Sequence, residues 1–139
     1  MTVSILVVDD EPDAAELFRQ CFRREVRGGT YAMHFAASGE GALQLLAPGI
    51  EPPLIVILSD INMPAMDGLN LLRAIKTAYP ELPVMIVTAY GDDERRRLAT
   101  EFGAAEFLTK PVDLDFLKAQ LRCLQLPSAR EGARASREP

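Results

Sequence analysis

Short runs of aliphatic residues alternate along the chain with segments in which apolar residues recur at helical spacing. The apolar runs are typical of strands that are buried on both faces. Five such strands are predicted, over Ser4–Val8, Tyr31–Ala37, Leu54–Leu58, Val84–Val87 and Glu106–Thr109. Because a helical pattern follows each strand after a short connection, we expect an α/β fold with a parallel sheet, right-handed crossovers and helices on both faces.

Proline, glycine and capping residues bound the predicted helices. The first helix opens at Pro12 and its pattern continues to the Gly28-Gly29 break. Others are predicted over Gly41–Ala47, from the Asn62–Gly68 turn to Pro80, from Asp92 or Asp93 to Gly103, and from near Asp113 to Pro127. Residues 127–139 contain no aliphatic side chain larger than alanine. They are predicted to be a disordered tail or linker, so the folded domain is expected over residues 1–126.

Length and charge narrow the classes of function. A chain of 139 residues is enough for one domain. Fifteen basic and 20 acidic residues give a net charge of −5 at pH 7, which argues against nucleic-acid binding through a broad basic surface. No apolar run reaches the ~18 residues of a membrane span, and the first residues lack the features of a signal peptide. The sequence therefore predicts a cytoplasmic protein without membrane association.

Polar residues with complementary chemistry follow four of the five predicted strands. Asp9 and Asp10 follow the first strand, Asp60 the third, Thr88 the fourth and Lys110 the fifth. Ligands of open parallel sheets bind beyond the carboxyl ends of the strands, so we expect these side chains to converge. Carboxylates at such close range repel each other, and a hard divalent cation such as Mg²⁺ relieves that repulsion. With an ammonium and a hydroxyl nearby, one carboxylate can serve as a nucleophile in phosphoryl transfer.

The motifs at these strand ends resemble the receiver domain of bacterial two-component response regulators. The resemblance rests on Leu6–Glu11, Asp60–Pro64 with Asp67-Gly68, Thr88-Ala89 and Lys110-Pro111, and it covers residues 3–125. It implies a flavodoxin-like, doubly wound sheet with strand order 2-1-3-4-5, for which the receiver fold is itself a standard example. It also implies a phosphorylation-switched signalling protein rather than an enzyme with a separate substrate.

The resemblance assigns a metal and a phosphoryl acceptor. Asp60 would accept a phosphoryl group from a sensor histidine kinase or a phosphotransfer protein. The metal, Mg²⁺ or alternatively Mn²⁺, would be bound by Asp10, Asp60 and the main-chain carbonyl of Asn62, with Asp9 acting through water. Lys110 would contact a phosphoryl oxygen, and a cis peptide bond after it would direct its side chain inward.

The resemblance also implies a switch that controls a downstream effector. Thr88 would move to the phosphoryl group, and Phe107 would turn into the space that Thr88 leaves. This would change the surface formed by the helix after Asp92, the fifth strand and the last helix. The family often has tyrosine where Phe107 stands, so an outward ring would lack a hydroxyl, and a plain core aromatic is the alternative interpretation. Asn62 and Tyr90 occupy positions that tune dephosphorylation in the family, and the bulk of Tyr90 is expected to shield the acyl phosphate.

Other interpretations fit the sequence less well or stay open. A flavodoxin-like FMN carrier needs a phosphate-binding loop after the first strand, where the acidic segment Asp9–Asp13 would repel phosphate. An aspartate phosphohydrolase would place its nucleophile after the first strand in a D-x-D pattern, and the sequence does not support it. A pseudo-receiver would lack a site residue, whereas none is missing here. The sequence leaves open a stand-alone regulator, an excised receiver, a phosphorelay intermediate and a homodimer. The run Asp92–Arg97 sums to zero charge and predicts a solvated helix face, with partner docking as the alternative.

Overall fold

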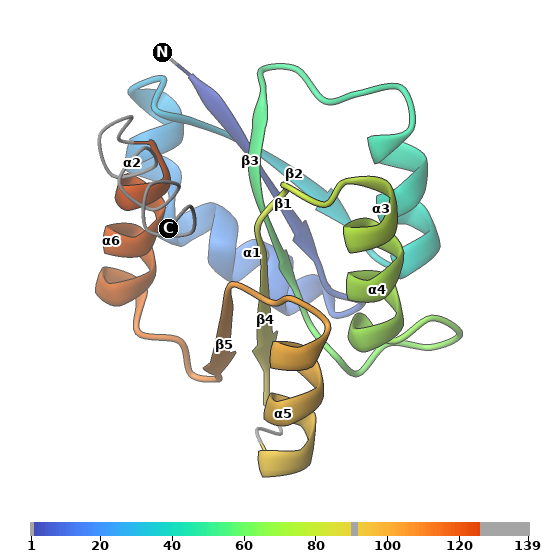
Figure 1. Cartoon of the computed structure of the whole chain (residues 1–139). Coiled ribbons are helices and arrows are strands. Elements are labelled where there is room, and N and C mark those ends of the chain that lie inside the picture. The colour runs from blue at the N-terminus through green and yellow to red at the C-terminus, as the bar shows by residue number, and fades with distance from the viewer. Residues whose placement is uncertain (1, 90–91, 126–139) are drawn as a thin grey trace, which may run out of the picture.

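The computed structural model describes residues 2–89 and 92–125 and contains the parallel sheet expected from the sequence. The sheet has five strands in the order β2-β1-β3-β4-β5 (Figure 1), which confirms the flavodoxin-like, doubly wound fold. The strands are β1 (Val3–Val8), β2 (Tyr31–Ala36), β3 (Leu54–Ser59), β4 (Val84–Thr88) and β5 (Glu106–Thr109). Val8 pairs with Ala36 on one side and with Ser59 on the other, so β1, β2 and β3 end together at one edge.

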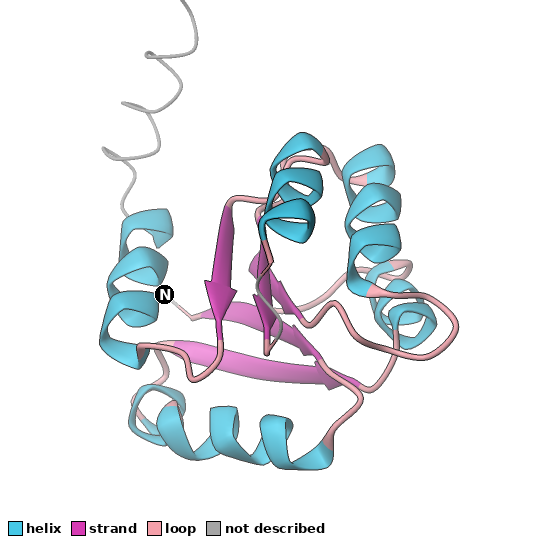
Figure 2. Cartoon of the chain, turned by 90° about the horizontal axis from the view of Figure 1, so that it is seen from below, coloured by secondary structure: helices cyan, strands magenta, loops and turns pink. Residues whose placement is uncertain are grey.

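Helices cover both faces of the sheet (Figure 2). One layer contains α1 (Pro12–Cys21), α2 (Arg23–Arg27) and α6 (Leu114–Gln125), and the other contains α3 (Gly39–Leu46), α4 (Gly68–Ala78) and α5 (Asp93–Glu101). No helix among the described residues is long and apolar enough to cross a membrane. The predicted tail from Pro127 onward lies outside the described residues.

Alternate side chains of the central strands enter opposite cores, as strand geometry requires. Leu6 and Ile57 pack under the α3, α4 and α5 layer, whereas Ile5 and Leu58 pack under the α1 and α6 layer. All four side chains are fully buried or nearly so. The continuous apolar runs of the sequence therefore reflect burial on both faces of the sheet.

The first predicted helix is in fact two helices, which corrects the sequence-based boundary. The break falls at Phe22, whose φ and ψ angles of −103° and 9° end α1 and start α2. Its ring is fully buried, stacked on Phe18 and edge-on to Tyr31, and Lys118 of α6 donates a hydrogen bond to the carbonyl of Cys21. Tertiary packing therefore overrides the continuous helical pattern at this point.

Smaller differences concern element ends. The helix predicted from Gly41 begins at Gly39, because the hydroxyl of Ser38 caps it by accepting a hydrogen bond from the Gly41 N–H at 3.0 Å. The second strand ends one residue earlier than predicted, at Ala36, and the third continues to Ser59. The fourth strand includes Thr88, which was predicted to follow it, whereas Asp9, Asp60 and Lys110 directly follow their strands.

Candidate functional site

Three aspartates from two neighbouring strand ends gather at the carboxyl edge of the sheet. Asp9 and Asp10 follow β1, and Asp60 follows β3. One carboxylate oxygen from each lies within 4.8 Å of those of the other two. Asp9 and Asp60 are buried, whereas Asp10 is exposed. This donor set, made only of carboxylate oxygens and open to solvent on one side, fits a hard divalent cation.

Lys110, which follows β5, provides the positive charge that the aspartates require. Its Nζ donates hydrogen bonds to Asp9 Oδ2 at 2.9 Å and to Asp60 Oδ2 at 3.3 Å. Burial by itself would lower the pKa of Lys110, but the hydrogen bond that it donates to Asp9 and the charges of Asp60 and Asp9 outweigh burial and raise this pKa. The peptide bond between Lys110 and Pro111 is cis, as the resemblance implies.

Backbone N–H groups hold the carboxylate of Asp60 in place. Its Oδ1 accepts hydrogen bonds from the N–H groups of Ile61 at 2.7 Å and Asn62 at 3.3 Å. Its Oδ2 is therefore the oxygen that faces Lys110. Asp9 is fixed in a similar way, because its Oδ1 accepts a hydrogen bond from the N–H of Glu11 at 3.0 Å.

Gly68 sets the position of the loop that carries Asp60, a role that the sequence did not reveal. Its N–H donates to the carbonyl of Ile61 at 2.8 Å. A Cβ at this position would overlap the carbonyl oxygen of Asp60 and lie 2.7 Å from Ile61 Cα. The first turn of α4 therefore rests directly on the backbone after β3. The sequence contains this glycine in the Asp67-Gly68 pair, but a glycine in a turn does not by itself indicate a close backbone contact.

Thr88 and Phe107 lie on the neighbouring strands β4 and β5. Thr88 is fully buried at the end of β4, and its carbonyl accepts a hydrogen bond from the Lys110 N–H at 2.8 Å. Phe107 is half-buried, pairs with Ile86 and packs against the core under α3, α4 and α5. Tyr90 lies outside the described residues.

Comparison with known proteins identifies the family. Residues 5–122 match the model of the response regulator receiver domain. The chain belongs to this receiver family. Among curated relatives, it is 36% identical over its whole length to the response regulator protein FleR of Pseudomonas aeruginosa, of which it covers 28%. It is 35% identical to the response regulator MprA of Mycolicibacterium vanbaalenii over 89% of the chain and 51% of that protein. The receiver thus spans between about a quarter and half of the relatives' length.

Solved structures show the same relationship. The receiver superposes on chemotaxis protein CheY4 of Vibrio cholerae with a TM-score of 0.76 and 25% identity, covering 89% of this chain and 99% of that one. It matches the signal receiver domain of an HD domain-containing protein from Pseudomonas fluorescens with a TM-score of 0.78 and 28% identity, covering 97% and 99%. The chain is therefore a receiver domain of two-component response regulators, a signalling fold.

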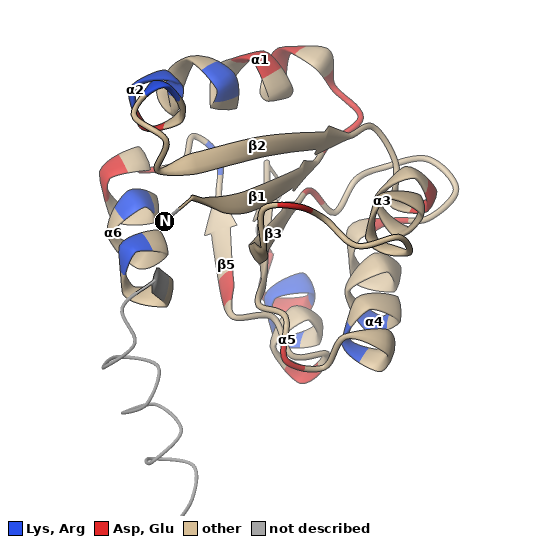
Figure 3. Ribbon diagram, turned by 90° about the horizontal axis from the view of Figure 1, so that it is seen from above, with Lys and Arg blue, Asp and Glu red and all other residues tan. Residues whose placement is uncertain are grey.

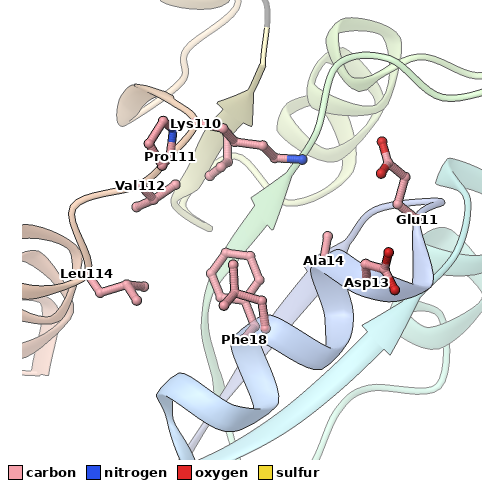
Figure 4. A pocket seen from close by; sticks show the side chains of 10 residues that line it. Glu11, Asp13, Ala14, Phe18, Lys110, Pro111, Val112 and Leu114 are labelled. Atoms are coloured by element: carbon pink, nitrogen blue, oxygen red, sulfur yellow. The ribbon is translucent and has the colours of Figure 1, made fainter.

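A groove of about 630 Å³ opens beside the receiver's aspartates, between α1 and the segment after β5 (Figure 4). Its lining is mainly apolar, with Phe18 and the exposed Leu17 on α1 facing Val112 and Leu114. Lys110 also lines it, and Figure 4 shows the lysine side chain extending from the end of β5 toward the end of β3. The sequence did not predict this groove, because it depends on how α1 sits relative to a loop far along the chain.

Charge is distributed unevenly around the receiver (Figure 3). The loop into α1 is acidic, with Asp9, Asp10 and Glu11 in succession and Asp13 in the first turn. Basic residues lie on α2 and α6, and others lie on α4 and α5. The loop that carries Asp9 and Asp10 is therefore locally acidic.

Proposed function

We propose that this receiver accepts a phosphoryl group on Asp60 from the phosphohistidine of a sensor histidine kinase or a phosphotransfer protein. The observation that carries the proposal is the contact of Lys110 Nζ with Asp60 Oδ2 inside a cluster of three aspartates. Asp60 Oδ2 attacks the phosphorus and forms a P–O bond, while the P–N bond of the donor breaks. The electron pair of that bond stays on the histidine nitrogen, which then takes up a proton.

The chain's own groups prepare this transfer by alignment and charge. The N–H groups of Ile61 and Asn62 fix Asp60 Oδ1, so Oδ2 remains directed toward the incoming phosphorus. Lys110 is shared between Asp9 and Asp60 and can shift toward a phosphoryl oxygen as negative charge arrives. Both effects act in a partly buried site, where charges interact more strongly than in bulk water.

Mg²⁺, with Mn²⁺ as an alternative, fits the carboxylate cluster. Asp10 and Asp60 would hold the ion together with the main-chain carbonyl of Asn62, and Asp9 would act through water. When bound, the ion supplies positive charge to the phosphoryl oxygens. Asp10 is the exposed member of the cluster, so its oxygens are the ones most open to an ion arriving from solvent.

The groove between α1 and the segment after β5 supports docking of the phosphodonor protein. It adjoins Lys110 and presents apolar side chains, among them that of Leu17, a residue that is 56% exposed. An exposed leucine over a concave apolar surface suits the apolar stripe of an amphipathic helix. A donor helix seated there would bring its histidine to the aspartate edge. A kinase partner also supports our proposal that the protein is cytoplasmic.

Phosphorylation would switch the surface of α5, β5 and α6 toward a downstream effector. The dianionic group on Asp60 offers Thr88 a strong acceptor, and movement of Thr88 makes room for Phe107. Homodimerisation through the same surface is a second outcome of this switch. The greater length of the curated relatives also keeps an excised receiver and a phosphorelay intermediate as alternatives to a stand-alone regulator.

Asn62 and Tyr90 are proposed to tune loss of the phosphoryl group by hydrolysis. Water attacks the phosphorus, and the acyl phosphate returns to the Asp60 carboxylate and inorganic phosphate. We expect Tyr90→Ala to shorten the half-life of the phosphorylated protein, because it removes bulk that would shield the acyl phosphate. An unchanged half-life would reject the shielding.

Incubation with acetyl phosphate and Mg²⁺, followed by intact mass measurement, tests the phosphorylation. We expect one added phosphoryl group on the wild type, none on Asp60→Asn, and none after chelation of the metal. Asp115→Asn, which changes an exposed carboxylate on α6, is the matched control and keeps the label. Persistent labelling of Asp60→Asn would reject Asp60 as the acceptor.

A further inference from the structure

Arg96 of α5 lies against the aromatic ring of Phe107. Its Cζ is 4.7 Å from the ring centroid, within the range of a cation–π contact. The adjacent arginines instead pair with carboxylates of their own helix: Arg95 with Asp92, and Arg97 with Glu94 and Glu101. Among the described residues, no carboxylate forms an ion pair with Arg96. The basic run that the sequence predicted as a solvated face therefore contains one side chain with a different contact.

The ring that Arg96 contacts belongs to the strand that leads into the site. Phe107 precedes Lys110 by three residues, and Lys110 hydrogen-bonds the carbonyl of Thr88 through its N–H. Phe107 also pairs with Ile86, two residues before Thr88 on β4. A change in the position of the ring is thus connected to the phosphoryl site through short segments of β4 and β5.

We propose that Arg96 is a positioning residue that holds the ring of Phe107 in its present place. Because this contact stabilises the unswitched state, a larger fraction of the protein must be phosphorylated before the ring turns. The proposal rests on the proposed function, in which Phe107 turns toward the space left by Thr88. Phenylalanine has no hydroxyl with which to anchor itself to a neighbour. The guanidinium of Arg96 supplies that anchoring through the ring face, and the contact is lost when the ring turns inward.

Removal of the Arg96 guanidinium should shift the equilibrium of the protein toward the switched state. A cation–π contact at an exposed site corresponds to about a two- to fivefold change in an equilibrium constant. We therefore expect Arg96→Ala to lower the beryllofluoride concentration at half-saturation, with Mg²⁺ present, by about two- to fivefold. Arg96→Lys, which retains a cation, should restore most of the wild-type value. Arg95→Ala, which loses an ion pair on the same helix, is the matched control and should leave the midpoint unchanged.

Fluorine NMR reports the position of Phe107 directly. The protein is labelled with para-fluorophenylalanine, and the resonance of residue 107 is identified from its loss in Phe107→Leu. Without metal or beryllofluoride, this resonance should shift in Arg96→Ala and stay in place in Arg95→Ala. A role of Arg96 in helix stability alone would leave the resonance of the folded protein unchanged.

The two measurements separate failure of this inference from failure of the proposed function. A wild type that responds to beryllofluoride while Arg96→Ala gives the same midpoint and the same fluorine resonance overturns the role of Arg96 alone. A wild type that does not respond to beryllofluoride overturns the proposed function and the coupling that depends on it. A shifted resonance together with a lowered midpoint supports both.

Discussion

Lys110 Nζ lies 2.9 Å from Asp9 Oδ2, although 101 residues separate the two in sequence. The side chain of Asp9 is only 4% exposed and that of Lys110 26% exposed, so neither charge is well hydrated. Lys110 also lies 3.3 Å from Asp60 Oδ2. In the protein without metal, one ammonium therefore compensates two buried carboxylates, and its removal leaves both without a counter-charge.

Lys110→Met should lower the free energy of unfolding by about 1–3 kcal/mol at neutral pH without metal, because buried carboxylates lose their cation. Mg²⁺ should then stabilise this variant more than it stabilises the wild type, since the ion enters a more negative site. Urea unfolding with and without Mg²⁺ measures both effects. Lys118→Met, which breaks the ion pair between α6 and Glu25 of α2, is the control. If Mg²⁺ stabilised the wild type, Lys110→Met and Lys118→Met equally, Lys110 would not be the cation that compensates both aspartates.

The stabilising effect of Lys110 should depend on pH in the alkaline range. Because its pKa is raised in the folded protein from the ordinary 10.5, the stabilisation is fully present below that value. It is lost as the pH rises through the higher pKa of the folded state. The difference in unfolding free energy between wild type and Lys110→Met should therefore be constant from about pH 7 to pH 10 and shrink above 10.5. A difference that grows above pH 10.5 would contradict this sign.

Gly68→Ala should impair both stability and phosphorylation. The added Cβ would overlap the Asp60 carbonyl and force the loop after β3 away from α4. We expect a loss of about 2–4 kcal/mol in chemical denaturation, and slower labelling by acetyl phosphate in the protein that remains folded. Gly28→Ala is the control, since its Cβ would meet no atom nearer than the carbonyl oxygen of Arg24 at 3.4 Å. Normal labelling of Gly68→Ala would show that the contact does not position Asp60.

Ala65→Gly should not lower the free energy of unfolding, in contrast to an alanine-to-glycine substitution within a helix. Ala65 has a φ of 68°, and the N–H of Met66 bonds back to the carbonyl of Pro64 across it. A left-handed conformation costs a non-glycine residue about 1–2 kcal/mol, whereas glycine adds about 0.5–1 kcal/mol of chain entropy to folding. The variant should therefore be about 0–1.5 kcal/mol more stable than the wild type. Ala74→Gly within α4 should cost about 1 kcal/mol by the same urea measurement. Equal losses in both would show that Ala65 is not strained.

The sequence predicted those features that follow from strand periodicity. Asp9, Asp60 and Lys110 each follow a short apolar run, and parallel strands bring such positions to one edge, so their convergence could be anticipated. The order of the strands came from the family resemblance.

Features that depend on how helices rotate and approach the sheet could not be anticipated. The break at Phe22 depends on the packing of its ring with Phe18 and Tyr31. The contact of Arg96 with Phe107 depends on which side of α5 faces β5, and three consecutive arginines give no indication of that. The close approach of Gly68 to Asp60 is likewise a relation in space between a helix start and a strand end.

Locating the phosphoryl group on the chain is the most direct test of the site. The protein is phosphorylated with acetyl phosphate and Mg²⁺, the acyl phosphate is reduced with borohydride, and the modified residue is found by peptide mass mapping. We expect reduction at residue 60 alone, converting the aspartate to homoserine, and no modified residue when Mg²⁺ is chelated. Reduction at Asp9 or Asp10 in the wild type, or modification that persists without metal, would contradict the assignment of Asp60 as the phosphoryl acceptor.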